Sequence, residues 1–263
     1  MTERGEALLL AVIQGLTEFL PISSSGHLEA WKRISGSELQ GDLSLDVLLH
    51  LATLFAVLLV YRRDVARLIG ALLGGGESRR ELLLVLLGAV PAGVFGLLLR
   101  SRIEGLSLAA PWVLPVAWVG CGLALLTIPL ALRRGSAPRP IGVGAALWIG
   151  VWQVVALLPG VSRSGITIVA ALWAGVEREE AARYSFLIAA PLVAGAALLE
   201  VPDLLRGGEA GSGAGVLLPA FLLAFLIGWV ALKLLLRLLR TGRMHLWGYY
   251  LLAAAVGLIA FGL

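Results

Sequence analysis

Two polar stretches interrupt an otherwise apolar sequence and carry the side chains best suited to chemistry. The first, Gln14–Leu28, reads QGLTEFLPISSSGHL and holds a carboxylate, three serines and an imidazole. The second, Trp152–Thr167, reads WQVVALLPGVSRSGIT and holds a guanidinium. Ionisable side chains are costly in hydrocarbon, so within a membrane segment they usually mark a functional site. The candidate catalytic residues are therefore Glu18, Ser24, His27 and Arg163.

The spacing of these residues indicates how they would act together. Ser24 lies three residues before His27, which is the separation of neighbours on one helix face, and Glu18 lies four residues after Gln14. If the two stretches meet inside the membrane, these groups converge with Arg163 at the ends of half-helices, where backbone N–H groups and a guanidinium favour a phosphate anion. Serine and threonine also serve as packing residues in membrane helices, so the hydroxyls indicate function less strongly than the charges do. The expected substrate-binding residues are Gln14, Ser23, Ser25, Ser162, Ser164 and Thr167.

Composition places the chain in the membrane. Of its 263 residues 59% are hydrophobic and 14% are charged, and the mean hydropathy is +0.93. Long apolar runs without ten-residue alternating strands favour transmembrane helices over a barrel. The net charge of +4 does not indicate nucleic-acid binding, because nearly all arginines lie at the ends of apolar runs. The sequence predicts an all-α integral membrane protein.

Proline and serine divide each polar stretch into two half-length helices. Pro21 ends the first half-helix near Leu20, and the serines that follow can cap a second one to about Ile34. Two such half-helices form a re-entrant hairpin, whose irregular backbone is tolerated only where it lines a cavity. Hairpins are expected at about 6–34 and 141–175, the second with half-helices Ile141–Leu158 and Ser162–Gly175, and spans at about 45–61, 82–99, 112–132, 184–199, 216–236 and 246–261.

The pattern of one hairpin followed by three spans occurs twice, in residues 1–136 and 137–263. Because a hairpin returns to its starting side and three spans then cross, the second repeat must begin on the opposite face. We expect one membrane domain of two inverted-topology repeats, an arrangement known from transporters.

Basic residues orient the predicted spans. Fourteen of the 21 lie on one face: Arg62, Arg63, Arg67, Arg79, Arg80, Arg133, Arg134, Arg139, Arg178, Arg183, Lys233, Arg237, Arg240 and Arg243. Six lie on the other: Arg4, Lys32, Arg33, Arg100, Arg102 and Arg206. The positive-inside rule makes the first face cytoplasmic and puts both termini outside, so a site on the first hairpin should open to the outer face. Asp46 and His50, four residues apart in the first full span, are second-tier site residues.

The motifs EFLPISSSGHL and PGVSRSGIT resemble the two signatures of the bacterial undecaprenyl-diphosphate phosphatase family, also known for bacitracin resistance, and the resemblance covers essentially the whole chain. It implies an enzyme of the bacterial cytoplasmic membrane that hydrolyses undecaprenyl diphosphate to the monophosphate and inorganic phosphate. This reaction recycles the lipid carrier for peptidoglycan synthesis. Gln14 stands where many members have glutamate, which weakens a mechanism needing two carboxylates on one metal.

The expected chemistry is phosphoryl transfer, in which positioning and electrostatic stabilisation dominate. A divalent cation, Mg²⁺ or Ca²⁺, is expected near Glu18, and the partners are the polyprenyl diphosphate and membrane lipids. Ser24 is the candidate nucleophile, with His27 or Glu18 as its base. Attack by His27 or by water is left open, as is a homo-oligomeric state. The alternative functions are a transporter or flippase of a phosphorylated polyprenyl lipid, and an ion or small-anion channel.

Overall fold

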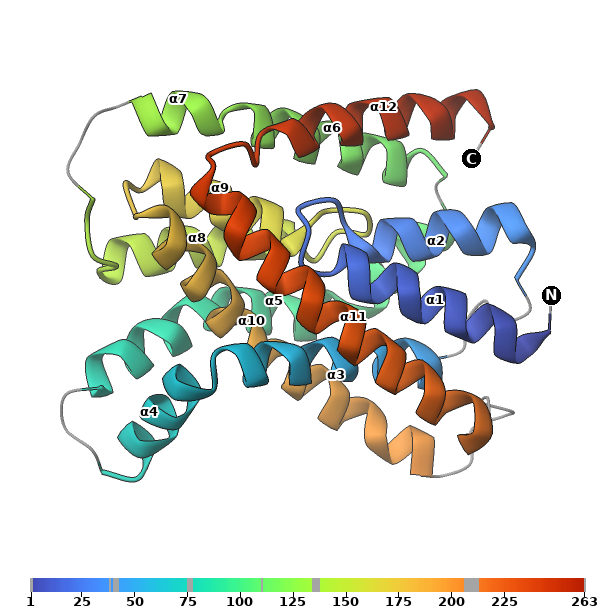
Figure 1. Ribbon diagram of the computed structural model, residues 1–263, viewed down its shortest axis with the longest axis horizontal. Helices are drawn as coiled ribbons and strands as arrows, with labels where there is room; N and C mark the ends of the chain where they lie inside the picture. The colour runs from blue at the N-terminus through green and yellow to red at the C-terminus, as the bar shows by residue number, and fades with distance from the viewer. Residues whose placement is uncertain are drawn as a thin grey trace.

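A computed structural model describes residues 2–37, 39, 43–74, 78–109, 111–133, 138–205 and 213–262 (Figure 1). Every regular element within these ranges is helical, in agreement with the predicted all-α class. The helices are α1 (Glu3–Thr17), α2 (Ser24–Ser35), α3 (Leu43–Val60), α4 (Arg62–Leu72), α5 (Arg79–Ala109), α6 (Val113–Leu126), α7 (Ile128–Arg133), α8 (Val143–Val155), α9 (Arg163–Trp173), α10 (Arg178–Leu205), α11 (Ala214–Arg240) and α12 (Leu246–Ala260).

Both predicted hairpins consist of two short helices, but their first helices end earlier than expected. α1 ends at Thr17 and α8 ends at Val155, each four residues before a proline. A proline has no N–H to donate to the carbonyl four residues earlier, so Pro21 and Pro159 remove the hydrogen bonds that would extend these helices. The predicted ends near Leu20 and Leu158 were therefore three residues too late.

Within the described ranges, four helical stretches are long and apolar enough to cross a membrane: Arg79–Leu99, Val113–Arg133 (α6 with α7), Arg178–Leu199 and Gly215–Arg240. A fifth span is formed if α3 and α4, which are bent by 88° at Tyr61, are counted together. The last predicted span corresponds to α12, an apolar helix of only 15 residues, which is short of the roughly 20 needed to cross a bilayer. These elements make the chain a multi-pass membrane protein.

Helix α4 lies in the stretch 62–80, where the arginines predicted only a cytoplasmic loop. Arg63 and Arg67 are exposed on this helix, and Leu68 and Ala71 are buried on its other side. This amphipathic pattern is the signal that could have revealed the helix. It is typical of a helix lying along a membrane surface, which explains the sharp turn from α3 into α4.

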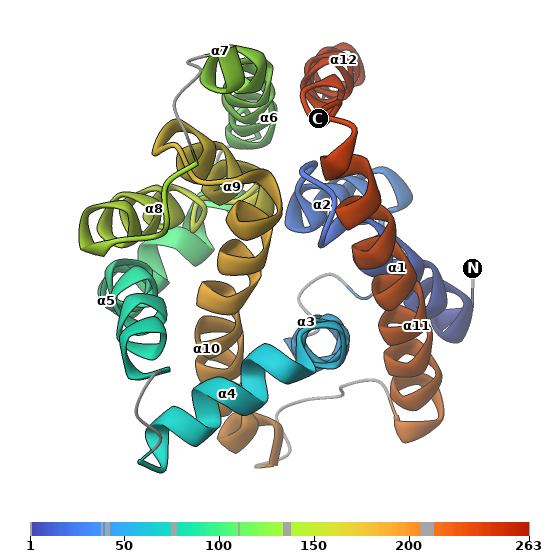
Figure 2. The same ribbon diagram turned by 60° about the vertical axis from the view of Figure 1, so that its left-hand side comes forward.

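The two halves pack in matching ways. α1 packs along α11, α8 packs along α5, and α6 packs along α12 (Figure 2). A β-carbon on Gly15 of α1 would lie 2.9 Å from the backbone oxygen of Ala224, and one on Gly150 of α8 would lie 2.6 Å from that of Gly88. Only glycine permits such close helix contacts. The interpretation as inverted repeats stays a prediction, and these matched contacts are consistent with it.

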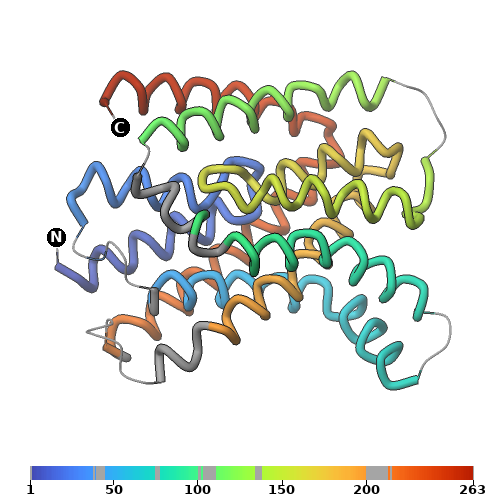
Figure 3. Tube along the Cα trace, turned by 180° about the vertical axis from the view of Figure 1, so that it is seen from behind, coloured from blue at the N-terminus to red at the C-terminus, as the bar shows by residue number. Residues whose placement is uncertain are grey.

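Both termini lie at one end of the molecule, and α4 and the end of α7 lie at the other (Figure 3). The connections between α1 and α2 and between α8 and α9 lie side by side in the middle of the fold (Figure 1). Ser164 Oγ, in the first turn of α9, donates a hydrogen bond of 3.4 Å to the carbonyl of Leu20 in the α1–α2 connection. The two hairpin tips therefore meet inside the protein.

Candidate functional site

Each hairpin tip ends in a serine that caps the following helix. Ser23 Oγ accepts a hydrogen bond of 3.1 Å from the N–H of Gly26, and Ser162 Oγ accepts one of 3.1 Å from the N–H of Gly165. A capping serine satisfies one of the free N–H groups at a helix start and leaves others for a ligand. The first residues of α2 and α9 are Ser24 and Arg163, so both candidate residues stand at positive helix ends.

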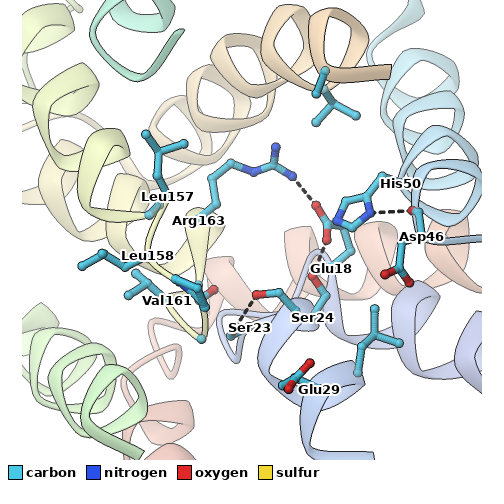
Figure 4. A pocket seen from close by; sticks show the side chains of 18 of the residues that line it. Glu18, Ser23, Ser24, Glu29, Asp46, His50, Leu157, Leu158, Val161 and Arg163 are labelled. Atoms are coloured by element: carbon cyan, nitrogen blue, oxygen red, sulfur yellow. Dashed lines mark hydrogen bonds and ion pairs between the residues drawn. The ribbon is translucent and has the colours of Figure 1, made fainter. Parts of the chain in front are cut away.

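The Glu18 carboxylate joins the two tips (Figure 4). Its Oε2 accepts hydrogen bonds from Ser24 Oγ and, at 3.1 Å, from Gln14 Nε2. Its Oε1 is bound by the guanidinium of Arg163, which is 145 positions away in the chain. The structure therefore brings a carboxylate, a hydroxyl and a guanidinium together, as the sequence analysis expected of these three residues.

A cavity of about 540 Å³ opens beside this cluster. One wall is apolar and comes from the α8–α9 connection and α10, with Leu157, Leu158 and Val161 next to the base of Arg163 (Figure 4). The opposite wall is polar and comes from α2 and the start of α3, with Asp46 and His50 facing Arg163 across the cavity. Such a cavity suits an amphiphile with a charged head and an apolar chain.

His27 does not line this cavity. Its ring stacks on Trp118 of α6 with the centroids 4.8 Å apart, and its Nε2 lies 2.6 Å from the hydroxyl of Tyr250 on α12. Its Nδ1 lies 2.8 Å from the carbonyl of Ser23, so both ring nitrogens have partners. In this arrangement His27 clamps α2 between α6 and α12, whereas the sequence analysis expected its imidazole beside Ser24.

The reason lies in the direction that α2 takes from the tip. Ser25, Leu28, Glu29 and Lys32 line the cavity, and their spacing of three and four residues defines one helix face. His27 is two residues past Ser25, about 200° around the helix. The spacing correctly placed Ser24 near His27 along the helix, but only the packing of α2 shows which face meets the cavity.

Among the other predicted site residues, Ser23, Ser25, Ser162, Asp46 and His50 line the cavity. Ser164 and Thr167 do not, and both are fully or nearly buried. Thr167 Oγ1 donates to the carbonyl of Arg163 at 2.7 Å and also bonds the Ser185 hydroxyl, so it holds the start of α9 in place. These two residues support the site rather than lining it.

The sequence analysis did not assign Glu29, Lys32 or Arg33 to the site, and it counted the two bases as loop charges. All three line the cavity, and Lys32 is only 5% exposed. Their place on the face of α2 that begins at Ser25 was the signal that could have identified them.

Each carboxylate that lines the cavity is ion-paired with a base that also lines it. Three ion pairs join the lining carboxylates to the lining bases: Glu18 with Arg163, Glu29 with Arg33, and Asp46 with Lys32. No group of three or more His, Cys, Asp or Glu side chains that could hold a metal is found among the described residues. A metal here would need ligands from a bound molecule in addition to those of the protein.

Two helical hairpins that meet at a buried ion pair beside an amphiphilic cavity, together with the apolar helices around them, define a polytopic membrane protein with a polar site among its helices. The chain belongs to the family of the bacitracin resistance protein BacA, because the sequence model of that family matches residues 7–257.

Relatives with the name undecaprenyl-diphosphatase align over nearly the whole chain. The one from Geobacter metallireducens is 41% identical over 261 residues, which cover 97% of each chain. That from Rubrobacter xylanophilus is 38% identical over 264 residues, again with 97% of each chain covered. That from Rhodopirellula baltica is 34% identical over 264 residues and covers 100% of both chains.

Proposed function

We propose that this protein hydrolyses undecaprenyl diphosphate to undecaprenyl phosphate and inorganic phosphate. The reaction would return the lipid carrier to cell-wall synthesis, and it would confer bacitracin resistance as the family name suggests. The names of the relatives support this substrate. The observation that carries the proposal is the contact of Glu18 with both the Ser24 hydroxyl and the Arg163 guanidinium.

In the proposed mechanism Ser24 is the nucleophile and Glu18 is its base. Ser24 Oγ attacks the terminal phosphorus and passes its proton to the carboxylate, while the bond from phosphorus to the bridging oxygen breaks and polyprenyl monophosphate leaves. Glu18 gives this proton to the departing monophosphate. Water then attacks the phosphoserine and passes a proton to the Glu18 carboxylate, which returns it to Ser24 Oγ as the bond from phosphorus to Oγ breaks and inorganic phosphate is released. The hydrogen bond from Ser24 to Glu18 supports this choice of base over His27, whose ring nitrogens bind Ser23 and Tyr250.

Arg163 would bind the phosphate oxygens. Its guanidinium stands in the first turn of α9, where the positive end of the helix adds to its own charge. In phosphoryl transfer such positioning and charge stabilisation supply most of the catalysis. Because Arg163 also binds Glu18, one side chain would align the substrate with the residue that activates Ser24.

A divalent cation, Mg²⁺ or Ca²⁺, is also proposed, with Glu18 as a ligand. Gln14 Oε1 is buried beside Glu18 and has no hydrogen-bond partner among the described residues, so a second oxygen ligand is present. Mg²⁺ is commonly held by one or two protein oxygens together with substrate phosphates. When bound, the cation would neutralise diphosphate charge that the one-to-one ion pairs of the cavity leave uncompensated.

The distribution of charges and the position of the cavity support the proposed membrane orientation. From the two hairpin tips in the middle of the fold, the cavity extends along α2, the start of α3 and the later part of α10, toward the end where the termini lie (Figure 1). With the arginine-rich end in the cytoplasm, the cavity opens to the outer face of the cytoplasmic membrane. A cysteine replacing Ser78, before α5, should resist an impermeant thiol reagent added to intact cells. Labelling from outside would contradict this orientation.

The decisive test is phosphate release from a polyprenyl diphosphate by detergent-purified protein, measured with and without EDTA. Release by the wild type, loss with Ser24→Ala and loss with EDTA would agree with the proposal. No release by folded wild-type protein in the presence of Mg²⁺ or Ca²⁺ would contradict the function. Release that is insensitive to EDTA would contradict only the cation.

The meeting of two re-entrant hairpins also favours a second candidate, a flippase for a phosphorylated polyprenyl lipid, because transporters build their sites in this way. A carrier gains nothing from a hydroxyl bonded to a carboxylate. Ser24→Ala should therefore abolish phosphate release if the protein is a phosphatase. If it is a flippase, the same variant should still move a fluorescent polyprenyl phosphate across the membrane of proteoliposomes.

A further inference from the structure

The polar wall of the cavity carries a buried lysine for which the mechanism has no role. Lys32, in the last turn of α2, donates to Oδ1 and Oδ2 of Asp46 at 2.9 and 3.0 Å. A lysine ammonium has three N–H donors, and these are its only hydrogen bonds among the described contacts. One N–H therefore remains for a molecule in the cavity that both residues line.

Lys32 is directed toward the reacting groups by the geometry of α2. It lies on the face that starts at Ser25, about two turns further along the helix. Helical side chains lean toward the N-terminus of their helix, which here is the Ser24 tip. Its partner Asp46 is one turn before His50, and His50 lines a second small cavity together with Glu18 and Arg163. The ammonium is thus held on the wall of the cavity that Glu18, Ser24 and Arg163 also line.

The two walls of the cavity fix how an amphiphilic diphosphate would enter. An apolar chain favours the wall of Leu157, Leu158 and Val161, next to the base of Arg163 (Figure 4). The phosphate joined to that chain then lies on the Arg163 side. The terminal phosphate faces the opposite wall, where Asp46 holds the lysine.

We propose that Lys32 binds the terminal phosphate and makes the cavity select diphosphates over monophosphates. This inference rests on the proposed phosphatase function and names the residue that recognises the substrate class. A site built to hold a charged group discriminates strongly against an analogue that lacks it, because its own polar groups are then left unpaired. The monophosphate product lacks this contact and would leave readily.

The test compares the binding of inorganic diphosphate and inorganic phosphate to full-length protein in detergent, by calorimetry in one buffer. Wild-type protein should bind the diphosphate at least tenfold more tightly. Lys32→Gln should reduce this preference at least tenfold, which is about 1.4 kcal/mol. The matched control is Lys233→Gln, because the only other lysine of the chain lies on α11 with its Nζ 3.7 Å from the Trp229 ring centroid and does not line the cavity.

A second variant separates lost binding from added repulsion. Lys32→Gln leaves the carboxylate of Asp46 unpaired, and that charge alone would repel anions. Lys32→Gln combined with Asp46→Asn restores neutrality and should still lack the preference. Recovery of the wild-type preference in the double variant, or equal binding of both anions by the wild type, would overturn the role of Lys32. Neither result depends on turnover, so a failure of the inference is distinct from a failure of wild-type protein to release phosphate from the lipid.

Discussion

The two hairpin tips share a backbone design but differ in the side chain that stands first in the helix. In both, a serine caps the glycine N–H three residues later at 3.1 Å, and two serine hydroxyls lie 3.3 Å apart. The first tip then presents Ser24, and the second presents Arg163. One tip thus supplies a group that can react and the other a group that can bind. Glu18 contacts both, so the site exists only where the tips meet.

The tips also differ in backbone strain. Ser23 has φ of 70° and is the only residue other than glycine with positive φ among the described residues, whereas Ser162 has φ of −74°. Such conformations are costly and tend to occur at functional sites. The strain lies at the tip that carries Ser24, the proposed nucleophile.

The largest loss of activity is expected at the first tip, which carries Ser24. Ser24→Ala removes the proposed nucleophile and should lower kcat at least about 10³-fold, about 4 kcal/mol of barrier. Steady-state phosphate release would measure it. The neighbouring Ser25→Ala removes a hydroxyl whose described bond is to Ser23, and it should cost at most about tenfold. Equal losses in the two variants would remove the distinction between Ser24 and its neighbour.

The next largest loss of activity is expected at the second tip, which carries Arg163. Arg163→Lys keeps the charge but loses the planar fork that grips both phosphate and Glu18, so kcat/KM should fall at least tenfold, about 1.4 kcal/mol. The corresponding control is Arg183→Lys, whose guanidinium pairs with Asp64 and Glu81 outside the cavity. Near wild-type kcat/KM for Arg163→Lys would exclude a bidentate grip.

The clamp around His27 should affect stability more than rate. Tyr250→Phe removes the partner of His27 Nε2 and should reduce stability by about 1 kcal/mol, while kcat stays within about threefold. Thermal unfolding in detergent and phosphate release would measure the two effects. Tyr249→Phe, a change at the exposed neighbouring residue, should alter neither. A loss of rate as large as that of Ser24→Ala would show that the hydroxyl of Tyr250 takes part in turnover.

The smallest effect is expected on stability, when the two capping serines are replaced in turn. Glycine in place of a capping serine costs a few tenths of a kcal/mol, but it also adopts positive φ without strain. Ser23→Gly should therefore leave the protein about 1 kcal/mol more stable than Ser162→Gly does, as judged by thermal unfolding in detergent. Equal shifts would mean that the φ of Ser23 carries no cost.

Much of the site could be predicted because its signals are local. Proline, serine and glycine marked both hairpins. Glu18 and Arg163 were identified by the cost of a charge in a membrane, and Ser24 by its spacing from His27. The errors also have local causes. The first half-helices end three residues early because each proline removes a hydrogen bond, and α4 was missed because its three arginines were taken for a loop.

The sequence by itself determined the membrane class, the apolar helices and the two tips, since hydropathy, capping and proline act within a few residues. Tertiary structure alone decided which side chains meet. The contact between Glu18 and Arg163 joins positions 145 apart, His27 turns toward Trp118 and Tyr250, and Lys32 enters the cavity wall. The physical reason is that helical spacing relates the residues of one helix to each other, whereas the rotation of that helix against its neighbours depends on how all the helices pack.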